Sequence, residues 1–259
     1  MDSSLKLLIR TRNDLQAIRI GSENRLGRKA DGSAQSIDER ILSEDTYNYF
    51  NAFSDYIKDE ESKIEKMLKK ELKKHRIYNE FLADVKGVGT VVAAWILSEF
   101  DIHKATTVSK LWQFSGLNPG LVIGKKRVEQ GDTYMYVPTD TLVRGDKQTA
   151  GFVRPYNSKL RSVLIGILAS GFIKAKSPYA LNYYYPYKER LLNEESIIEG
   201  GKKDEKWSEV SLGHRDNAAK RYMIKMFLKD LYVAWRTIEG LSVRPPYKEE
   251  YLGKKHQVA

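Results

Sequence analysis

The chain has 259 residues, enough to bury a substantial core as one large domain with an extension or as two modest domains. It contains no cysteine, which excludes a disulfide framework and thiolate metal sites, and it has neither a leader pattern nor a long apolar run. Its 44 Lys and Arg residues exceed its 34 Asp and Glu residues, and the resulting net charge of +10 favours a polyanion as partner.

The first 75 residues predict a helical hairpin or coiled coil. Ser3 and Ser4 can cap a first helix, which runs to about Asn24. Its thin apolar stripe, which requires a partner helix, comprises Leu8, Leu15 and Ile18. A loop is expected at 27–36, and a second helix from Asp38 or Ser43 to about Lys74. Apolar residues recur in this second helix at three- and four-residue steps, at Phe53, Ile57, Ile64, Met67, Leu68 and Leu72.

Residues 82–97 predict a short helix, a Gly-Val-Gly turn and a second helix that opens with small residues. Glycines permit positive φ and close approach of the backbone to a ligand, and amides at the N-terminus of the following helix point outward to meet an anion. The pattern therefore predicts a phosphate clamp, whose residues are Lys86, Gly87, Val88, Gly89 and Thr90. Lys86 is expected at the exposed tip, and Thr90 either caps the next helix or donates to a phosphate.

Two other interpretations of this turn were weighed against the clamp. A dinucleotide-binding loop is disfavoured because Val92 stands where a third glycine is needed and the preceding segment is helical in pattern. A tight helix–helix turn that only packs, and touches no ligand, stays open.

A short helix is predicted at 109–114, and a Gly- and Pro-containing segment ends it at 115–120. Residues 122–128 and 133–137 predict a small β-hairpin, the only sheet we expect, within an insertion at 120–154. Its basic tip or face comprises Lys125, Lys126 and Arg127. This basic run either follows a nucleic-acid backbone or keeps an exposed edge strand from pairing with other molecules.

The remainder of the chain predicts helices at 158–174, from Ser177 onward and at 217–239, with a mobile connector at 193–212. The helix at 158–174 has one apolar face, typical of a core, which comprises Leu160, Val163, Leu164, Ile167, Leu168 and Phe172. The tyrosines between 183 and 187 either pack against other helices or stack on unpaired bases. The expected fold is mainly α. A helical hairpin extension spans 1–75, and a helix-hairpin-helix domain spans 76–259 and includes the β-hairpin insertion.

Four segments resemble the C-terminal domain of the bridge-RNA-guided insertion-sequence transposases, a family whose N-terminal half is a RuvC-like DEDD nuclease domain. They are residues 85–94 (VKGVGTVVAA), 111–119 (LWQFSGLNP), 156–161 (YNSKLR) and 218–223 (AAKRYM). Residues 12–26 also resemble the start of the coiled coil that joins the two halves of the family. The resemblance implies DNA as partner, or a structured RNA with DNA, and self-association through the coiled coil. It also implies a nucleic-acid-facing surface at Arg154, Asn157 and Arg161; without it, Asn157 would be an ordinary helix cap.

Two departures from the family weigh against catalysis. The nuclease domain has no counterpart in this sequence, so metal-assisted phosphodiester chemistry is unsupported. The family's serine nucleophile is also missing, because the corresponding stretch is Val-Ile-Gly-Lys at 122–125. Thr133, Thr139, Thr141 and Thr149 are the candidate substitutes, although strand or turn roles are more usual for such threonines.

No cofactor and no metal is predicted, because the four histidines are widely separated. A tyrosine recombinase is also disfavoured, since only His214 and Arg215 approach the constellation that such chemistry needs.

Three functions follow from these observations. The favoured one is a nucleic-acid-binding protein of transposase ancestry that is not catalytic alone and that loses affinity as salt rises. The second is an active transposase or recombinase subunit with an unrecognised nucleophile or a partner nuclease. The third is a structural or interaction protein whose hairpin only packs helices. We expect a cytoplasmic location, nucleoid-associated if the source is prokaryotic, and no membrane partner.

Overall fold

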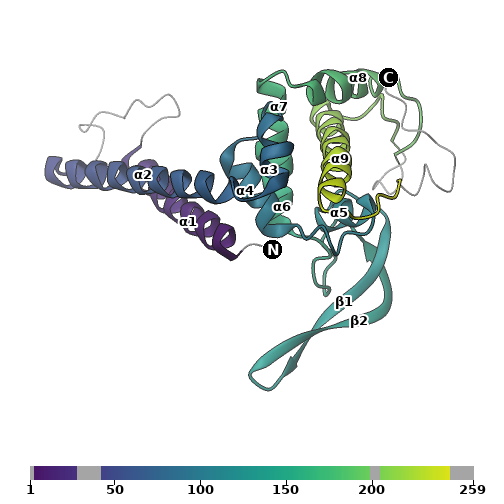
Figure 1. Cartoon of the computed structure of the whole chain (residues 1–259), viewed down its shortest axis with the longest axis horizontal. Helices are drawn as coiled ribbons and strands as arrows, with labels where there is room; N and C mark the ends of the chain where they lie inside the picture. Colours follow the sequence, from purple (N-terminus) through teal and green to yellow (C-terminus); the bar gives the residue numbers. More distant parts are fainter. Residues whose placement is uncertain (1–2, 28–41, 199–204, 246–259) are drawn as a thin grey trace.

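The computed structural model describes residues 3–27, 42–198 and 205–245. Within these residues it is mainly helical with one two-stranded antiparallel sheet, which confirms the expected fold class (Figure 1). The first part contains α1 (Ser3–Leu26), α2 (Glu44–Leu72), α3 (Arg76–Glu80), the 3-10 helix η2 (Leu82–Asp84), α4 (Thr90–Glu99) and α5 (Val108–Phe114). The strands β1 (Leu121–Gln130) and β2 (Thr133–Arg144) follow. The last part contains α6 (Ser158–Ser162), the π-helical η3 (Val163–Leu168), α7 (Ala169–Lys174), the π-helical η4 (Ala180–Tyr184), α8 (Tyr185–Arg190) and α9 (Leu212–Ile238).

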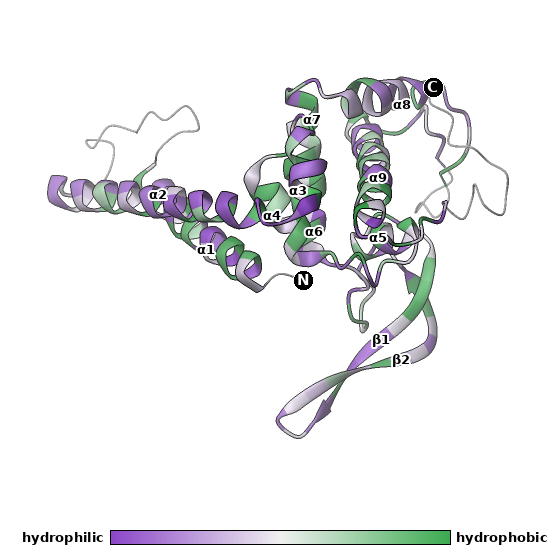
Figure 2. Cartoon of the chain, viewed as in Figure 1, coloured by the Kyte–Doolittle hydropathy of each residue, from purple (hydrophilic) through white to green (hydrophobic). Residues whose placement is uncertain are grey.

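The predicted helical hairpin is formed by α1 and α2, which lie side by side and project from the rest of the molecule (Figure 1). Ser43 is the N-cap of α2, because its side chain accepts a hydrogen bond from the Thr46 amide at 3.3 Å. The alternative start at Asp38 and the predicted loop at 28–36 lie outside the described residues. Much of α2 is hydrophilic, as Figure 2 shows, and it buries its apolar face against α1 and α4.

The predicted stripe on α1 was wrong in detail. Leu5 and Ile9 are completely buried, whereas Ile18 is 49% exposed. The cause is that the N-terminal half of α1 contacts α4 as well as α2, so two neighbours select its buried face. Farther along the hairpin, the contact is ionic: Glu61 is buried between Arg19, whose Nε lies 2.5 Å from its carboxylate, and Arg12, at 3.5 Å.

The core lies among α4, the continuous α6–η3–α7 segment and α9 (Figure 1). The predicted apolar face of residues 158–174 is largely confirmed, since Leu160, Leu164, Leu168 and Phe172 are completely buried. Ile167 was also expected inward but is 53% exposed. It lies in the π-helical η3, where the wider turn shifts the positions that face the core.

The last long helix begins five residues earlier than the expected start at Asn217. Ser211 caps it, because its side-chain oxygen accepts a hydrogen bond from the His214 amide. In the described part of the predicted connector, Ile197 and Lys206 form an antiparallel bridge. Residues 199–204 of that connector lie outside the described part of the chain.

The two strands form a ribbon that extends away from the helices (Figure 1). Its turn lies at Gly131, which has a positive φ of 61°. The basic run was expected at a tip or on one face. It lies instead along the middle of β1, where Lys125 and Arg127 share one face and Lys126 lies on the other. A bulge separates Ile123 from Lys125. Gly124, at this bulge, is buried against the Phe152 ring, and a Cβ placed on it would lie 2.6 Å from that ring.

Candidate nucleic-acid interface

The predicted clamp is a tight turn at residues 85–90, hereafter the glycine turn. Gly87 has φ of +103°, and a Cβ placed on it would lie 2.8 Å from the Phe172 ring and 3.2 Å from the Gly171 backbone. The close approach is mutual, since a Cβ on Gly171 would lie 2.9 Å from the Gly87 carbonyl oxygen. Because neither Gly87 nor Gly171 has a side chain, the backbone of the glycine turn packs directly against the backbone of α7.

The outer side of the glycine turn is polar and open. Lys86 and Gly89 are exposed, and no atom lies within 4 Å of a Cβ built on Gly89. Val88 is partly buried and packs on the core, while its amide donates to the Val85 carbonyl at 3.0 Å. Gly89 is the N-cap of α4. Within the described part of the chain, the amides of Gly89, Thr90 and Val91 have no hydrogen-bond acceptor.

Arg154, Asn157 and Arg161 gather around Tyr156 at the N-terminus of α6. The guanidinium of Arg161 lies 4.9 Å from the Tyr156 ring centre and also donates to the Asp146 carbonyl at 2.5 Å. Arg154 is exposed, lies 5.8 Å from the same ring centre and donates to Gln148 at 3.1 Å. Of the three, Arg154 has the greatest freedom to meet a ligand.

The Asn157 side chain makes hydrogen bonds within the fold through both of its polar atoms. Its side-chain oxygen accepts from the Leu160 amide at 3.0 Å, and its side-chain nitrogen donates to the buried carboxylate of Glu99 at 2.8 Å. Both polar atoms of the side chain are therefore used in capping α6 and in fastening it to α4.

On the β-ribbon, aromatic rings accompany two of the three basic side chains. Arg127 lies over Tyr134, with 3.9 Å between the guanidinium carbon and the ring centre, and Lys126 lies 5.5 Å from the centre of the Phe152 ring. Lys125 is exposed, and its carbonyl accepts from the Val153 amide at 2.7 Å. A cation held over a ring keeps its charge available at the surface while its stem is packed.

The predicted site residues do not converge on one spot. The glycine turn rests on Gly171, whereas Asn157 immediately precedes the first residue of α6, Ser158. These points are roughly 20 Å apart along the helix, at ~1.5 Å per residue. The interface therefore divides into the glycine turn at one end of the α6–η3–α7 segment and the root of the β-ribbon at the other.

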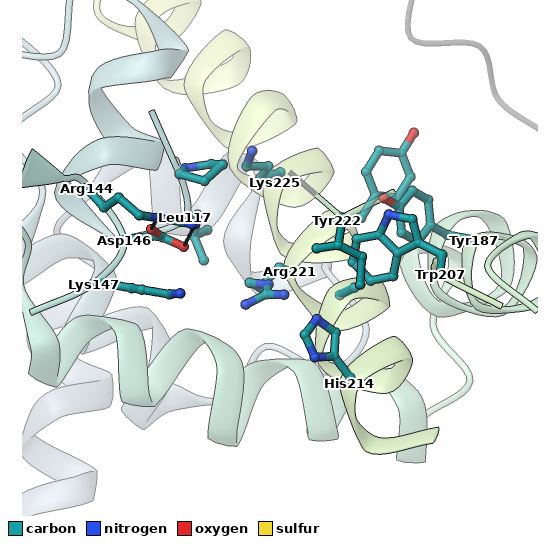
Figure 3. Close-up of a pocket in the computed structure, with 13 residues that line it drawn as sticks. Leu117, Arg144, Asp146, Lys147, Tyr187, Trp207, His214, Arg221, Tyr222 and Lys225 are labelled. Carbon is teal, nitrogen blue, oxygen red and sulfur yellow. Dashed lines mark hydrogen bonds and ion pairs between the residues drawn. The ribbon is translucent and has the colours of Figure 1, made fainter. Parts of the chain in front are cut away.

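Sequence reasoning missed a cavity of about 270 Å³ between α9 and the segment that follows β2 (Figure 3). Cationic side chains from Arg144, Lys147, Arg221 and Lys225 line it. The missed signal was a helix face: Ala218, Arg221, Tyr222 and Lys225 recur at steps of three and four residues along α9. Residues 218–223 carried part of the family resemblance, but their pattern was not interpreted as one face.

The tyrosines at 183–187 pack largely within the chain. Tyr187 stacks on Tyr222 with ring centres 4.4 Å apart, Tyr183 meets Tyr222 edge-on at 6.1 Å, and the Tyr184 hydroxyl donates to Asp216. Tyr185 is the most exposed of them, at 42%.

The threonines proposed as nucleophiles have turn and strand positions. Thr133 donates to the Gln130 carbonyl at 3.1 Å and Thr139 to the Gly124 carbonyl at 2.9 Å. Of the described residues that line the cavity of Figure 3, none is a serine or a threonine. Among the described residues, no three His, Asp or Glu side chains lie close enough together to hold a metal ion. In the same part of the chain, no helix has the length and apolarity needed to cross a membrane.

A scan of protein-family models finds none that matches this chain, and a search of curated proteins finds no significantly similar sequence.

Proposed function

We propose that the protein binds nucleic acid, with duplex DNA as the principal partner, by holding the phosphate backbone at the glycine turn. The observation that carries this proposal is the set of amides at Gly89, Thr90 and Val91, in the first turn of α4, which have no acceptor among the described residues. Amides at a helix N-terminus, together with the positive end of the helix dipole, favour a phosphate oxygen. Lys86 lies exposed beside them and adds a full positive charge.

The β-ribbon supports the same function at the other end of the molecule. A two-stranded antiparallel ribbon fits the major groove of duplex DNA, and exposed Lys125, Lys126 and Arg127 lie along β1. The net charge of +10 provides the general attraction to a polyanion. On the strength of the four segments that resemble transposase C-terminal domains, we infer a transposase-derived, non-catalytic binding module. Self-association through α1 and α2 is part of this proposal.

A second candidate is that the glycine turn only packs helices, and one specific observation favours it. The contact between Gly87 and Gly171 is enough to explain both glycines without any ligand. Packing does not account for Gly89, however, because a side chain there would meet open space and its φ of −92° is accessible to any residue. Gly89 is therefore the position at which the two functions make different predictions.

The test compares Gly89→Asp with Gly89→Asn. Both side chains have nearly the same shape, and both are good N-caps, so each variant should melt at or above the wild-type temperature. Only the aspartate places a negative charge where the phosphate is proposed to bind. We expect Gly89→Asp to bind labelled duplex at least tenfold more weakly than Gly89→Asn in a gel shift at low salt.

Equal affinities of the two variants, with both proteins folded, would assign the turn to packing alone. The wild-type affinity should also fall linearly with the logarithm of salt concentration, because neutralised phosphates release counterions. A denaturing gel of the same mixtures reports on the catalytic alternative. We expect no covalent protein–DNA species there.

A further inference from the structure

The cavity between α9 and the segment after β2 has a strong excess of positive charge. Arg144, Lys147, Arg221 and Lys225 line it, and Asp146 is the one carboxylate among its lining residues in the described chain. Arg144 already holds that carboxylate, with both oxygens within 3.1 Å of its guanidinium. In Figure 3 the side chains of Lys147 and Arg221 point toward one another across the cavity.

Arg221 is a partly buried cation of this cavity that has no direct partner among the described residues. Its side chain is largely shielded from solvent, yet it makes no hydrogen bond or ion pair with any described residue. Burial, reinforced by the like charge of Arg161, lowers the pKa of the Arg221 guanidinium. An arginine remains charged even so. The Asp146 carboxylate attracts it without a hydrogen bond or ion pair, and a bound anion would supply the direct partner that this shielded charge lacks.

An aromatic wall closes the other end of the cavity. Figure 3 shows the rings of Tyr187, Tyr222 and Trp207 together there, beside His214. Tyr187 and Tyr222 are stacked with 19° between their planes. Trp207 is held in place because Arg215 donates to its carbonyl oxygen at 3.2 Å and to that of the next residue at 2.9 Å.

A flat aromatic wall beside an unneutralised cationic pair matches a particular chemistry. Phosphate oxygens pair with guanidinium and ammonium groups, and a nucleobase stacks on tyrosine and tryptophan rings. The volume of about 270 Å³ lies near the lower limit of small-ligand sites, which hold ~300–1,000 Å³. This size suits one nucleotide and excludes a duplex.

We propose that the cavity binds one nucleoside phosphate, with the phosphate between Lys147 and Arg221 and the base against Tyr222 and Trp207. The nucleotide comes either from solution or from an unpaired position of a nucleic-acid strand. The strand source rests on the proposed function, whereas the free-nucleotide source does not depend on it.

The test is calorimetric titration of the full chain with four probes: dAMP, deoxyadenosine, inorganic phosphate and a short single strand of deoxyadenylate. We expect dAMP or the single strand to bind at least tenfold more tightly than phosphate or deoxyadenosine alone. This comparison uses the wild-type protein, so it does not depend on whether a variant folds. Binding by the single strand alone identifies the strand as the source, and equal binding by dAMP identifies the free nucleotide.

Arg221→Gln is the diagnostic variant, and Lys66→Gln, at an exposed position on α2, is the matched control. Because Arg221 has no partner among the described residues, its replacement leaves no hydrogen-bonding group behind, and the melting temperature should be retained. We expect Arg221→Gln to lower the affinity for the more tightly bound nucleotide probe at least tenfold. Lys66→Gln should leave that affinity unchanged. The proposal is overturned if no nucleotide probe exceeds phosphate in affinity, or if Arg221→Gln binds as the wild type does. A negative result for nucleotide binding in the cavity is distinguishable from a negative result for the proposed function. The Gly89→Asp and Gly89→Asn variants measure duplex binding at the glycine turn, which is a separate site.

Discussion

Replacing Gly87 by alanine should destabilise the whole domain. The backbone there has φ of +103°, a conformation that costs an L-residue about 1–3 kcal/mol. The new methyl group would also lie 2.8 Å from the Phe172 ring and 3.2 Å from the α7 backbone, and overpacking of this kind costs about 1–3 kcal/mol. The two effects act at one position, so we expect Gly87→Ala to lower the free energy of unfolding by about 2–5 kcal/mol.

Urea unfolding followed by circular dichroism measures this loss, with Gly89→Asn as the control in the same turn. The control has open space around it and gains a side-chain cap, so its stability should equal that of the wild type or exceed it by a few tenths of a kcal/mol. A Gly87→Ala protein within about 0.5 kcal/mol of the wild type would refute the reasoning, since the turn would then have to lie away from α7 without loss.

Three further variants test other contacts. Asn157→Ala removes the α6 cap and a hydrogen bond to α4, so the unfolding free energy should fall by about 1–2 kcal/mol; an unchanged urea midpoint contradicts this. Glu61→Gln takes the charge from the buried partner of Arg19 and should cost about 1–3 kcal/mol in thermal melts, whereas a wild-type melting temperature argues against the pair. Burial and Asp230 raise the pKa of Tyr179 above 10, so the unfolded chain loses this proton first and stability falls as pH rises past about 10. Tyr179→Phe should flatten that alkaline loss; an equally steep loss would exclude Tyr179 as its source.

Local patterns predicted most of the helices and the sheet. The four-residue spacing of Leu160, Leu164 and Leu168 was enough to place the core face of residues 158–174. Caps identified some ends, as at Ser43. At Ser211 the same chemistry was overlooked, because the next residues, Leu-Gly-His, offer little helical periodicity before Asn217.

Local spacing of apolar residues could not predict burial that depends on contacts with residues distant in the chain. Leu5 and Ile9 are buried because α4, about 80 residues later in the chain, covers them, and no local spacing contains that information. The exposed position of Ile167 likewise reflects a π-helical turn, for which the sequence carries no simple signal.

The candidate site was predicted in part. Positive φ at Gly87 was expected from the Gly-Val-Gly pattern and is observed. One of the two roles expected of Thr90 was to cap the next helix, but it is the first residue of α4, and Gly89 is the N-cap. Duplex binding and nucleic-acid contacts stay predictions. The cavity could not be predicted, because Lys147 and Arg221 are far apart in sequence and meet only when α9 packs beside the segment after β2. Like charges converge there through tertiary structure.

Among the described residues, the β-ribbon is bonded to the rest of the chain at its root, by the Gly145 amide to the Gly120 carbonyl at 2.8 Å, and at mid-strand, by the Val153 amide to the Lys125 carbonyl at 2.7 Å. Beyond these bonds, Tyr134 and Tyr136 share one face of the ribbon and are about half exposed, as is Met135 on the other face, and an isolated pair of strands is only marginally stable in water. Amide protons near Gly131 should therefore exchange with solvent through local opening, orders of magnitude faster than those of α9. We therefore expect the outer part of the ribbon to reorient, or to become ordered on a partner, with little change in the stability of the core.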